Sequence, residues 1–439
     1  MQRVGFKYIE SAFELSSSEM QRIIKDFHSE MKKGLAGSKS SLKMIPEYVE
    51  RPSGKEKGEF LALDLGGTHF RVLSLRLKSG RKTEAPLSKK FILKKELIKG
   101  SGSKLFDFIA ECIKAFIAEQ KLGAGEKYNV GFTFSFPTKK KNIASGLLIR
   151  WTKGFKAKGV EGKDVVRLLN SALARKGVSN TKVVAIVNDT VGTFVTRSYK
   201  DPNCDMGVIL GTGTNACYCE KIKNITKWKG GRTSSGEMVI NIEWGNFDKL
   251  CLTAYDKQLD SASANPGEQI LEKMVSGMYL GKLAGLVANS LIEQEILFNG
   301  QKKYIFCKSK NFKSEYASAI ESDTSGKLSR TNTLLKKVGI KNSTYADRKL
   351  LQRVCAIVSR RAARISASAM AAVITKIDPH LSGKHTIAVD GSVYEKHSGF
   401  SKKIKSALIE IFKKKASKIK LKLTKDGSGK GAAIIAATV

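Results

Sequence analysis

The chain has few acidic residues for its length, and it lacks the long apolar runs of a membrane protein. Its 439 residues include 78 Lys and Arg but only 40 Asp and Glu, which gives a formal net charge of +38. No stretch of 18 apolar residues occurs, so the sequence predicts no transmembrane helix. The first residues lack the apolar core of a secretory signal. We therefore expect a cytoplasmic protein, with secretion by another route as the alternative.

Cysteine is scarce, and its pattern excludes the common metal and disulfide frameworks. The seven cysteines are an odd number scattered along the chain. Cys217 and Cys219 are the closest pair, but no histidine or second cysteine pair completes a zinc site. The pattern is typical of free thiols in a reducing compartment.

The basic residues form short runs that lack an accompanying aromatic series. Such lysine runs stand at residues 89–90, 94–95, 139–141 and 413–415. Binding of single-stranded nucleic acid relies on aromatic rings that stack on bases. The sequence therefore favours a solvated basic surface. Contact with a polyanion or an anionic surface, such as RNA or a membrane, stays open as an alternative because a large basic excess attracts polyanions.

Strands and helices alternate along the chain, which is typical of an α/β fold in two or three domains. Hydrophobic periodicity predicts helices at 11–35, 105–120, 164–176 and 353–377, and strands at 60–65, 70–77, 129–136, 182–187, 205–210 and 386–389. The strand at 182–187 is continuously apolar, as in strands covered on both faces. Polar motifs directly follow the strands, and open α/β sheets bind ligands at that edge.

Glycine turns after these strands can bring backbone N–H groups close to phosphate oxygens. Asp64 ends a strand and is followed by Gly66-Gly67-Thr68, while residues 211–215 read G-T-G-T-N. Near the end, residues 426–433 read D-G-S-G-K-G-A-A. Neither a Walker loop nor a dinucleotide fingerprint is present. An ordinary hairpin turn at Asp64 is the alternative.

Asp189 directly follows the apolar strand that ends at Val187, and it lies between Asn188 and Thr190. A carboxylate held there can accept the proton of an alcohol as its oxygen attacks phosphorus. The alternative is that Asp189 caps a helix beginning near Val191.

Several polar residues near these motifs could bind the hydroxyl groups of a polyol. They are Ser135, Thr152, Lys153, Asn188, Asn215, Glu243 and Glu272. A sugar needs several converging partners, because each buried hydroxyl without one costs about 1–3 kcal/mol. Trp151 and Trp244 flank two of these positions, and core packing is the alternative for both rings.

With these motifs the chain resembles the hexokinase family in its eukaryotic, single-unit form, from about Phe13 to Ala437. The blocks that carry the resemblance occur in the family's order. They are L-A-L-D-L-G-G-T-H-F-R-V-L from Leu61, G-F-T-F-S-F-P from Gly131, R-W-T-K-G-F from Arg150, N-D-T-V-G-T from Asn188, G-T-G-T-N-A-C-Y from Gly211, N-I-E-W-G-N-F from Asn241, S-A-S-A-N-P-G-E-Q from Ser261, V-D-G-S-V-Y-E-K-H from Val389 and G-S-G-K-G-A-A from Gly427.

The resemblance implies an actin-like (ribonuclease-H-like) ATPase fold with two lobes around a deep cleft. The small lobe would comprise residues 54–185 and a C-terminal helix at 430–439, and the large lobe residues 1–53 and 186–429. It implies a hexokinase that uses ATP and Mg²⁺ to phosphorylate a hexose, glucose first among them, at the 6-hydroxyl group, the first step of glycolysis. We expect a monomer or a weak dimer.

The resemblance also implies residue roles, with Asp189 as base and Lys153 as its catalytic partner. The sugar would be held by Ser135, Phe136, Thr152, Lys153, Asn188, Asp189, Asn215, Glu243, Gln269 and Glu272. The nucleotide would be held by Asp64, Leu65, Gly66, Gly67, Thr68, His69, Thr212, Ser392, Gly427 and Gly429. Asp64 would also bind the magnesium ion through water.

Three positions depart from the family pattern. His69 stands where the family usually has asparagine, Lys282 where relatives usually carry glutamate, and Glu47 follows Pro46 where threonine is more usual. We expect the changes at Glu47 and Lys282 to be harmless. His69 and Lys282 keep one alternative open, a catalytically weak or inactive sugar sensor of the same fold.

Overall fold

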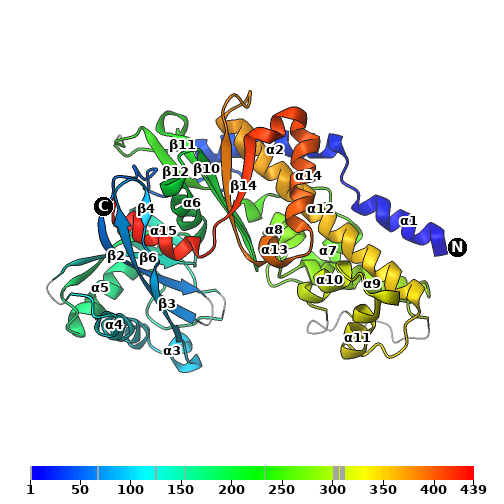
Figure 1. Cartoon of the computed structure of the whole chain (residues 1–439), viewed down its shortest axis with the longest axis horizontal. Coiled ribbons are helices and arrows are strands. Elements are labelled where there is room, and N and C mark those ends of the chain that lie inside the picture. The colour runs from blue at the N-terminus through cyan, green and yellow to red at the C-terminus, as the bar shows by residue number, and fades with distance from the viewer. Residues whose placement is uncertain are drawn as a thin grey trace.

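The structure is a computed structural model, and it describes residues 2–66, 69–123, 126–152, 154–231, 233–299, 306 and 312–439, apart from the side chains of residues 2–5 and of His69. Two six-stranded sheets organise this part of the chain (Figure 1). The β10 sheet has the strand order β1-β12-β11-β10-β13-β14. The β2 sheet has the order β4-β3-β2-β6-β9, with β5 paired to β3.

The strands and helices have the following bounds. The strands are β1 Ile45–Pro46, β2 Gly58–Gly66, β3 His69–Lys78, β4 Lys82–Thr83, β5 Leu87–Ile92, β6 Tyr128–Phe134, β7 Thr138–Asn142, β8 Ser145–Leu148, β9 Thr181–Val187, β10 Cys204–Leu210, β11 Thr214–Lys221, β12 Glu237–Asn241, β13 His385–Asp390 and β14 Ile419–Leu423. The α-helices are α1 Gln2–Phe13, α2 Ser17–Ala36, α3 Lys95–Lys99, α4 Gly102–Glu119, α5 Val165–Arg175, α6 Asp189–Lys200, α7 Ala254–Ser261, α8 Ile270–Val275, α9 Leu280–Glu293, α10 Ser314–Glu321, α11 Ser329–Lys337, α12 Tyr345–Ile377, α13 Ser392–Lys396, α14 Phe400–Phe412 and α15 Gly427–Ala436. Short 3₁₀ turns are η1 Ile222–Asn224, η2 Trp244–Asn246, η3 Gly326–Leu328 and η4 Lys413–Lys418.

The two sheets repeat one plan. Each starts with an antiparallel hairpin, β2 with β3 in one and β10 with β11 in the other. Each continues with parallel strands, β6 and β9 after β2, and β13 and β14 after β10. The sequence predicted two related strand–turn–strand units at Gly66 and Gly211, and the repeated hairpins confirm this prediction.

Helices α6 and α15 pack against each other between the two sheets (Figure 1). One buried hydrophobic cluster joins them to both sheets, with Leu73 and Val187 from the β2 sheet, Cys217 and Val239 from the β10 sheet, and Phe194 from α6. Continuously apolar strands predict a sheet that is covered on both faces. This prediction is confirmed, because helices lie on both faces of each sheet. The helix pair forms the central layer of the molecule.

The outer face of each sheet has its own core. Helices α4 and α5 cover the β2 sheet, and α4 buries a stripe spaced for one helix face through Leu105, Ile109, Ile113 and Phe116. The β10 sheet is covered by a larger cluster that includes α2, α8, α9 and α12. Helix α12 is buried around much of its circumference, because its alanines and serines allow close approach of neighbouring helices.

Two helix boundaries differ from the sequence prediction. The single helix expected at 11–35 is two helices, α1 and α2, separated at Glu14–Ser16. Ser16 caps α2 by accepting a hydrogen bond from the Glu19 backbone, and Glu19 completes the capping box. Helix α12 begins at Tyr345 rather than at residue 353, because Thr344 and Asp347 form a second capping box.

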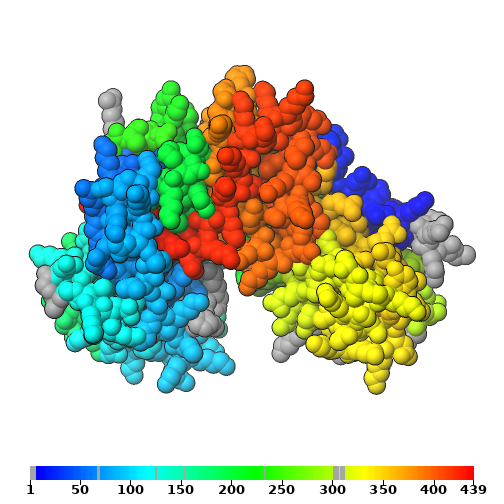
Figure 2. All heavy atoms as spheres, viewed as in Figure 1, coloured from blue at the N-terminus to red at the C-terminus, as the bar shows by residue number. Residues whose placement is uncertain are grey.

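A hollow opens between the two halves of the molecule on one side, while the halves stay joined on the other (Figure 2). Figure 2 shows it between the blue and cyan half, which contains the β2 sheet, and the yellow half, which contains α10 and α11. None of the described helices is both long and apolar enough to cross a bilayer.

Candidate active site

Asp189 stands at the start of α6, where β9 leaves the β2 sheet. The N-cap of this helix is Asn188, whose Oδ1 accepts hydrogen bonds from the Thr190 backbone at 3.0 Å and from the Thr190 hydroxyl at 2.6 Å. The alternative reading of Asp189 as a cap for a helix near Val191 is therefore wrong. Asp189 is half-buried, and its Oδ1 accepts a hydrogen bond from the Thr190 backbone at 2.9 Å.

Asn215 and Glu243 form a hydrogen-bonded set in the β10 sheet. The Asn215 amide donates to the Glu243 carboxylate at 2.9 Å, and the Asn241 amide donates to the same oxygen at 2.8 Å. Glu243 has a left-handed backbone with φ of 55°, an uncommon conformation that a surrounding structure must impose. Burial raises the pKa of Glu243, and the charges of Asp189 and Glu47 raise it further. Asp189 is thus an electrostatic neighbour of this set.

Glu272 joins the set from α8. Its carboxylate accepts a hydrogen bond from the Thr214 backbone at 2.9 Å, and the Trp244 indole donates to the Thr214 hydroxyl at 2.9 Å. A Cβ atom at Gly213 would lie 2.7 Å from the Glu272 carboxylate, so a side chain at this position would displace the carboxylate from where it lies. The structure therefore brings Glu272 beside Asn215, and it shows Trp244 as a buried support.

Gln269 precedes Glu272 at the N-cap of α8 and also has a left-handed backbone, with φ of 52°. The Asn265 amide donates to its side-chain oxygen at 2.7 Å. Gln269 therefore lies in the segment that carries Glu272, with its amide nitrogen left to donate.

Ser135 and Phe136 follow β6 on the β2 sheet. The Ser135 backbone donates to the Leu65 carbonyl at 3.3 Å, and a Cβ atom at Gly66 would lie 3.5 Å from Ser135 Cβ and Oγ. The predicted sugar and phosphate segments are therefore adjacent at this sheet edge. Phe136 is 6% exposed, with its ring centroid 4.8 Å from that of Trp151, so its side chain belongs to the core that supports Ser135.

Thr152 is half-buried next to the same aromatic cluster, and its carbonyl accepts a hydrogen bond from the Phe155 backbone at 3.0 Å. Lys153, Gly67 and Thr68 lie outside the described residues, as does the side chain of His69. Their predicted roles stay predictions.

The loops after β10 and β13 touch each other on the β10 sheet. A Cβ atom at Gly211 would lie 3.5 Å from Gly391 Cα. Gly391 has φ of 116°, and a Cβ atom there would lie 2.4 Å from the Leu210 carbonyl oxygen. Thr212 on the first loop and Ser392 at the start of α13 are both exposed, so two of the predicted nucleotide residues lie beside this contact.

The N-terminus of α15 lies between acidic residues from both sheets. The Ser428 hydroxyl donates to Asp64 at 3.2 Å, and the Gly427 backbone donates to Asp390 at 3.3 Å. Arg71 donates to Asp64 at 3.3 Å and to Asp426 at 2.7 Å. Burial raises the pKa of Asp390, as do the nearby acidic charges. A helix N-terminus attracts anions, and this one joins the two sheet edges.

Sequence reasoning missed Arg71, Asp390 and Asp426. Each lies within one of the motifs described above, but contacts between segments that are distant in the sequence leave no sequence signal. Gly427 and Gly429 lie at the same helix start and are buried. A Cβ atom at Gly427 would lie 2.9 Å from Thr193 Cα, so close packing on α6 explains this glycine. Leu65 is fully buried.

The described residues contain no group of three or more His, Cys, Asp and Glu side chains that could hold a metal ion. A Mg²⁺ ion bound together with a polyphosphate needs only one or two protein carboxylates, because it keeps several waters. Asp64 fits this requirement, since its carboxylate is 26% exposed and lies beside the α15 N-terminus.

The chain is similar to the known proteins of one family. Two family models, both described as Hexokinase, match residues 6–199 and 205–438. Hexokinase-1 of Rattus norvegicus is 41% identical over 438 residues, which are 97% of this chain and 47% of that protein. Hexokinase-2 of Homo sapiens is 39% identical over 436 residues, 96% of this chain and 47% of that protein. The chain thus spans about half the length of the curated relatives it matches.

A solved structure resembles the whole chain. The hexokinase from Schistosoma mansoni, complexed with glucose, has a TM-score of 0.87 and 36% sequence identity, and the match covers 100% of both chains.

Proposed function

Because the chain belongs to the hexokinase family and has its actin-like, two-lobed kinase fold, we propose that it transfers the γ-phosphoryl group of ATP to the 6-hydroxyl group of a hexose. The glucose in the Schistosoma mansoni structure supports glucose as the first substrate to test. The observation that carries the proposal is the position of Asp189 at the start of α6, directly after β9, from where its charge acts on Glu243 of the Asn215–Glu243 set.

In this proposal the β10 sheet holds the sugar, and Asp189 accepts the proton of its 6-hydroxyl group. The carboxylates of Glu243 and Glu272 accept hydrogen bonds from sugar hydroxyls, and the amides of Asn188 and Gln269 donate to them. The Asn188 oxygen is occupied by Thr190, which leaves its NH₂ group for the sugar. Carboxylate and amide groups bind polyols well because they satisfy hydroxyls that would otherwise lose water.

The nucleotide would lie along the loops that contain Thr212 and Ser392 and the N-terminus of α15. Phosphoryl transfer depends on positioning and on neutralising charge. The N-terminus of α15 attracts anions, and Arg71 offsets part of the negative charge of Asp64 and Asp426 beside it. Asp64 would hold Mg²⁺ through water, and the ion would neutralise phosphate charge when it is bound. Closure of the cleft would exclude water as a competing acceptor.

The isosteric substitution Asp189→Asn tests the role of the base. We expect ADP release in the presence of glucose to fall by about 10²- to 10⁴-fold, the usual contribution of general-base catalysis. Asp201→Asn, at the other end of α6, is the matched control and should keep full activity. Equal rates for the Asp189→Asn variant and the parent would refute the assignment. Sugar binding without any turnover in the parent would instead favour the sensor.

A second observation favours contact with a polyanion. Residues 401–425, which run through α14, η4 and β14, contain ten lysines and a single acid, Glu410. Arg364 binds Glu410 through both carboxylate oxygens, while Lys403 and Lys425 pair with Glu321 and Glu395, so the basic surface rests on the other eight lysines. We propose that this basic surface binds an anionic partner, in addition to catalysis. The cytoplasmic location and the monomeric or weakly dimeric state stay predictions.

A further inference from the structure

Lys140 departs from the solvated surface predicted for the lysine run at residues 139–141. Alternate residues of a strand point to opposite faces, and β7 places Lys139 and Lys141 in solvent. The Lys140 side chain points the other way and is only 5% exposed. The prediction of a solvated run is therefore wrong at this one position.

The buried ammonium group of Lys140 has two partners. It forms an ion pair with the Glu47 carboxylate and donates to the Ile186 carbonyl at 2.8 Å. The Glu47 side chain is 3% exposed. Burial of a charge is costly unless it is paired and hydrogen-bonded, so each charge depends on the other. The change at Glu47 that we expected to be harmless creates half of a buried ion pair.

This ion pair connects the two sheets. Glu47 follows β1 at the edge of the β10 sheet, where its backbone donates to the Val239 carbonyl at 3.0 Å. Lys140 belongs to the β7–β8 hairpin, and Ile186 belongs to β9 of the β2 sheet. The Ile186 backbone donates to the Ile143 carbonyl at 2.8 Å, which holds this hairpin against β9.

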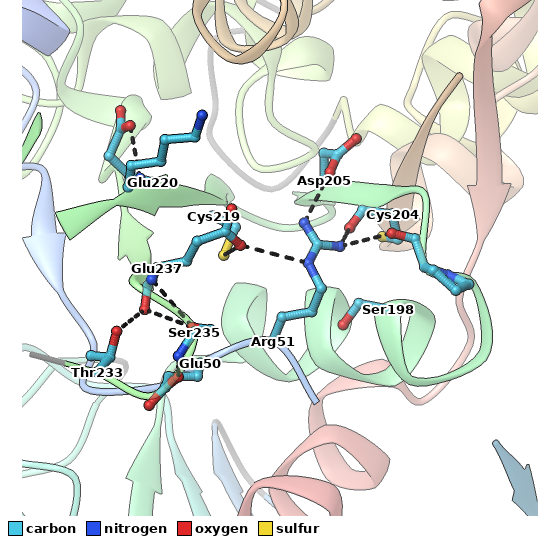
Figure 3. Close-up of polar contacts among 12 residues, drawn as sticks. Glu50, Arg51, Ser198, Cys204, Asp205, Cys219, Glu220, Thr233, Ser235 and Glu237 are labelled. Carbon is cyan, nitrogen blue, oxygen red and sulfur yellow. Dashed lines mark hydrogen bonds and ion pairs between the residues drawn. The ribbon is translucent and has the colours of Figure 1, made fainter. Parts of the chain in front are cut away.

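Glu50 and Arg51, which follow Glu47 in the chain, hold this segment on the β10 sheet (Figure 3). Glu50 accepts hydrogen bonds from the Ser235 backbone at 2.7 Å and from the Ser234 hydroxyl at 2.8 Å. Arg51 donates to the Asp205 carboxylate at 2.9 Å. Because this segment is held on the β10 sheet, Glu47 cannot easily move away from Lys140.

The ion pair lies close to the proposed active site. Ile186 precedes Asp189 by three residues at the end of β9. The charge of Glu47 contributes to the raised pKa of Glu243 and of the buried Cys217 thiol, and Asp189 acts on Glu243 in the same direction. Among the described residues, Lys140 forms the ion pair with Glu47. Its positive charge therefore offsets the negative charge of Glu47 next to Glu243.

We propose that Lys140 is a positioning residue for Asp189. It fixes the end of β9 through the Ile186 carbonyl, and it neutralises Glu47, which would otherwise stand as an unpaired buried carboxylate whose charge acts on Glu243, the electrostatic neighbour of Asp189. The inference deepens the proposed phosphoryl transfer and rests on it.

Two single substitutions, each removing one charge of the pair, test this role through the pH dependence of kcat/KM for glucose. The acid limb of that profile reports the pKa of the catalytic base in the free enzyme. Lys140→Met leaves Glu47 unpaired, so the acid limb should move to higher pH. Glu47→Gln leaves Lys140 unpaired, so the limb should move to lower pH. Each shift should be about 0.6–1.2 pH units, as for a unit charge at about 10–20 Å with an effective dielectric of about 20.

The double variant Glu47→Gln/Lys140→Met should return the acid limb to its original position. Lys140→Met should have a plateau kcat about tenfold below that of the parent, because it loses the hydrogen bond to the Ile186 carbonyl. The double variant loses the same bond and should have the same low plateau. Glu47→Gln should keep a plateau near that of the parent. Lys139→Met, one residue away on the exposed face of β7, is the matched control and should change neither quantity.

A purely structural ion pair would lower the melting temperature without opposite shifts of the acid limb, and this result would overturn the inference. If Lys140→Met does not fold, Glu47→Gln and the double variant still test the direction of the shift. A parent protein that forms no sugar phosphate would refute the proposed function, and the inference with it. An active parent with unshifted limbs in the variants would refute the inference alone.

Discussion

A methyl group added at Gly431 tests how α6 and α15 pack between the two sheets. A Cβ atom at Gly431 would lie 2.0 Å from the carbonyl oxygen of Gly192 and 2.4 Å from its Cα. These atoms belong to the backbone of α6 and cannot rotate away as a side chain could. The alanine variant therefore requires the two helices to separate by on the order of 1 Å, since protein interiors are too closely packed to absorb the methyl group.

The energetic result is the difference between two opposing effects. Alanine improves helix propensity over glycine by about 1 kcal/mol. Overpacking costs typically about 1–3 kcal/mol, and more where the backbone must move. The helix pair also contributes to the cluster that joins both sheets, so its displacement loosens contacts on each side. We expect Gly431→Ala to lower the free energy of unfolding by about 2 kcal/mol or more.

Gly429→Ala, two residues earlier on α15, is the matched control. A Cβ atom at Gly429 would lie 3.0 Å from Arg71 Nη2, the far end of a flexible side chain that can move. This variant should stay within about 1 kcal/mol of the parent, because propensity and local crowding nearly offset each other. Urea unfolding followed by circular dichroism measures both. Equal urea midpoints for the two variants would refute the packing role assigned to Gly431.

Other predictions concern acid stability, thiol reactivity and salt. Arg364 holds the pKa of Glu410 down from 4.5 to about 2, so its contribution to stability is complete above pH 4.5 and is lost as pH falls towards 2. Between pH 7 and pH 3 the urea midpoint of Glu410→Gln should fall less than that of the parent. Glu10→Gln removes an exposed pair with Arg353, and its midpoint should fall as much as that of the parent. Equal falls for the two variants would contradict this prediction. Of the described cysteines only Cys251 is exposed, and burial raises the pKa of Cys204 to about 12. A thiol reagent should therefore label Cys251 first, and early labelling of Cys204 in peptide maps would contradict the buried position. Heparin binding, as a model for polyanions, should fall steeply between about 50 and 200 mM salt and weaken when Lys413, Lys414 and Lys415 are changed to serine; binding insensitive to salt would exclude the basic surface as its cause.

The sequence predicted those parts of the fold that depend on local patterns. The strand that ends at Val187 was recognisable because its apolar run is continuous, and the hairpins at Gly66 and Gly211 because glycine turns separate apolar strands. Asn215 and Glu272 could be selected by their motifs, and the hydrogen bonds around Thr214 explain why these motifs lie together. Local chemistry and the order of motifs were sufficient for these features.

Long-range pairing was not predictable in the same way. Lys140 stands in a lysine run that looks uniformly solvated, and its partner Glu47 lies 93 positions away. Asp390 and Asp426 become part of the site only because α15 returns between the two sheets. The sequence indicated Ser16 to Ser18 as plausible helix caps, but the apolar stripe continues across Glu14–Ser16, so the break between α1 and α2 was not predicted.

The helix crossing and the proposed base belong to one structural unit. Gly192 follows Asp189 by three residues, so the close approach of α15 to α6 at Gly192 lies within one helical turn of the proposed base. The other helix begins at Gly427, which contacts Asp390, and Thr196 of α6 donates to the Gly427 carbonyl at 2.7 Å. Any change in the crossing should therefore move the proposed base relative to the proposed nucleotide side at the start of α15. Gly431→Ala, assayed at a temperature where it is fully folded, should lower kcat for glucose phosphorylation as well as stability, and an unchanged kcat would show that the two sides are set independently.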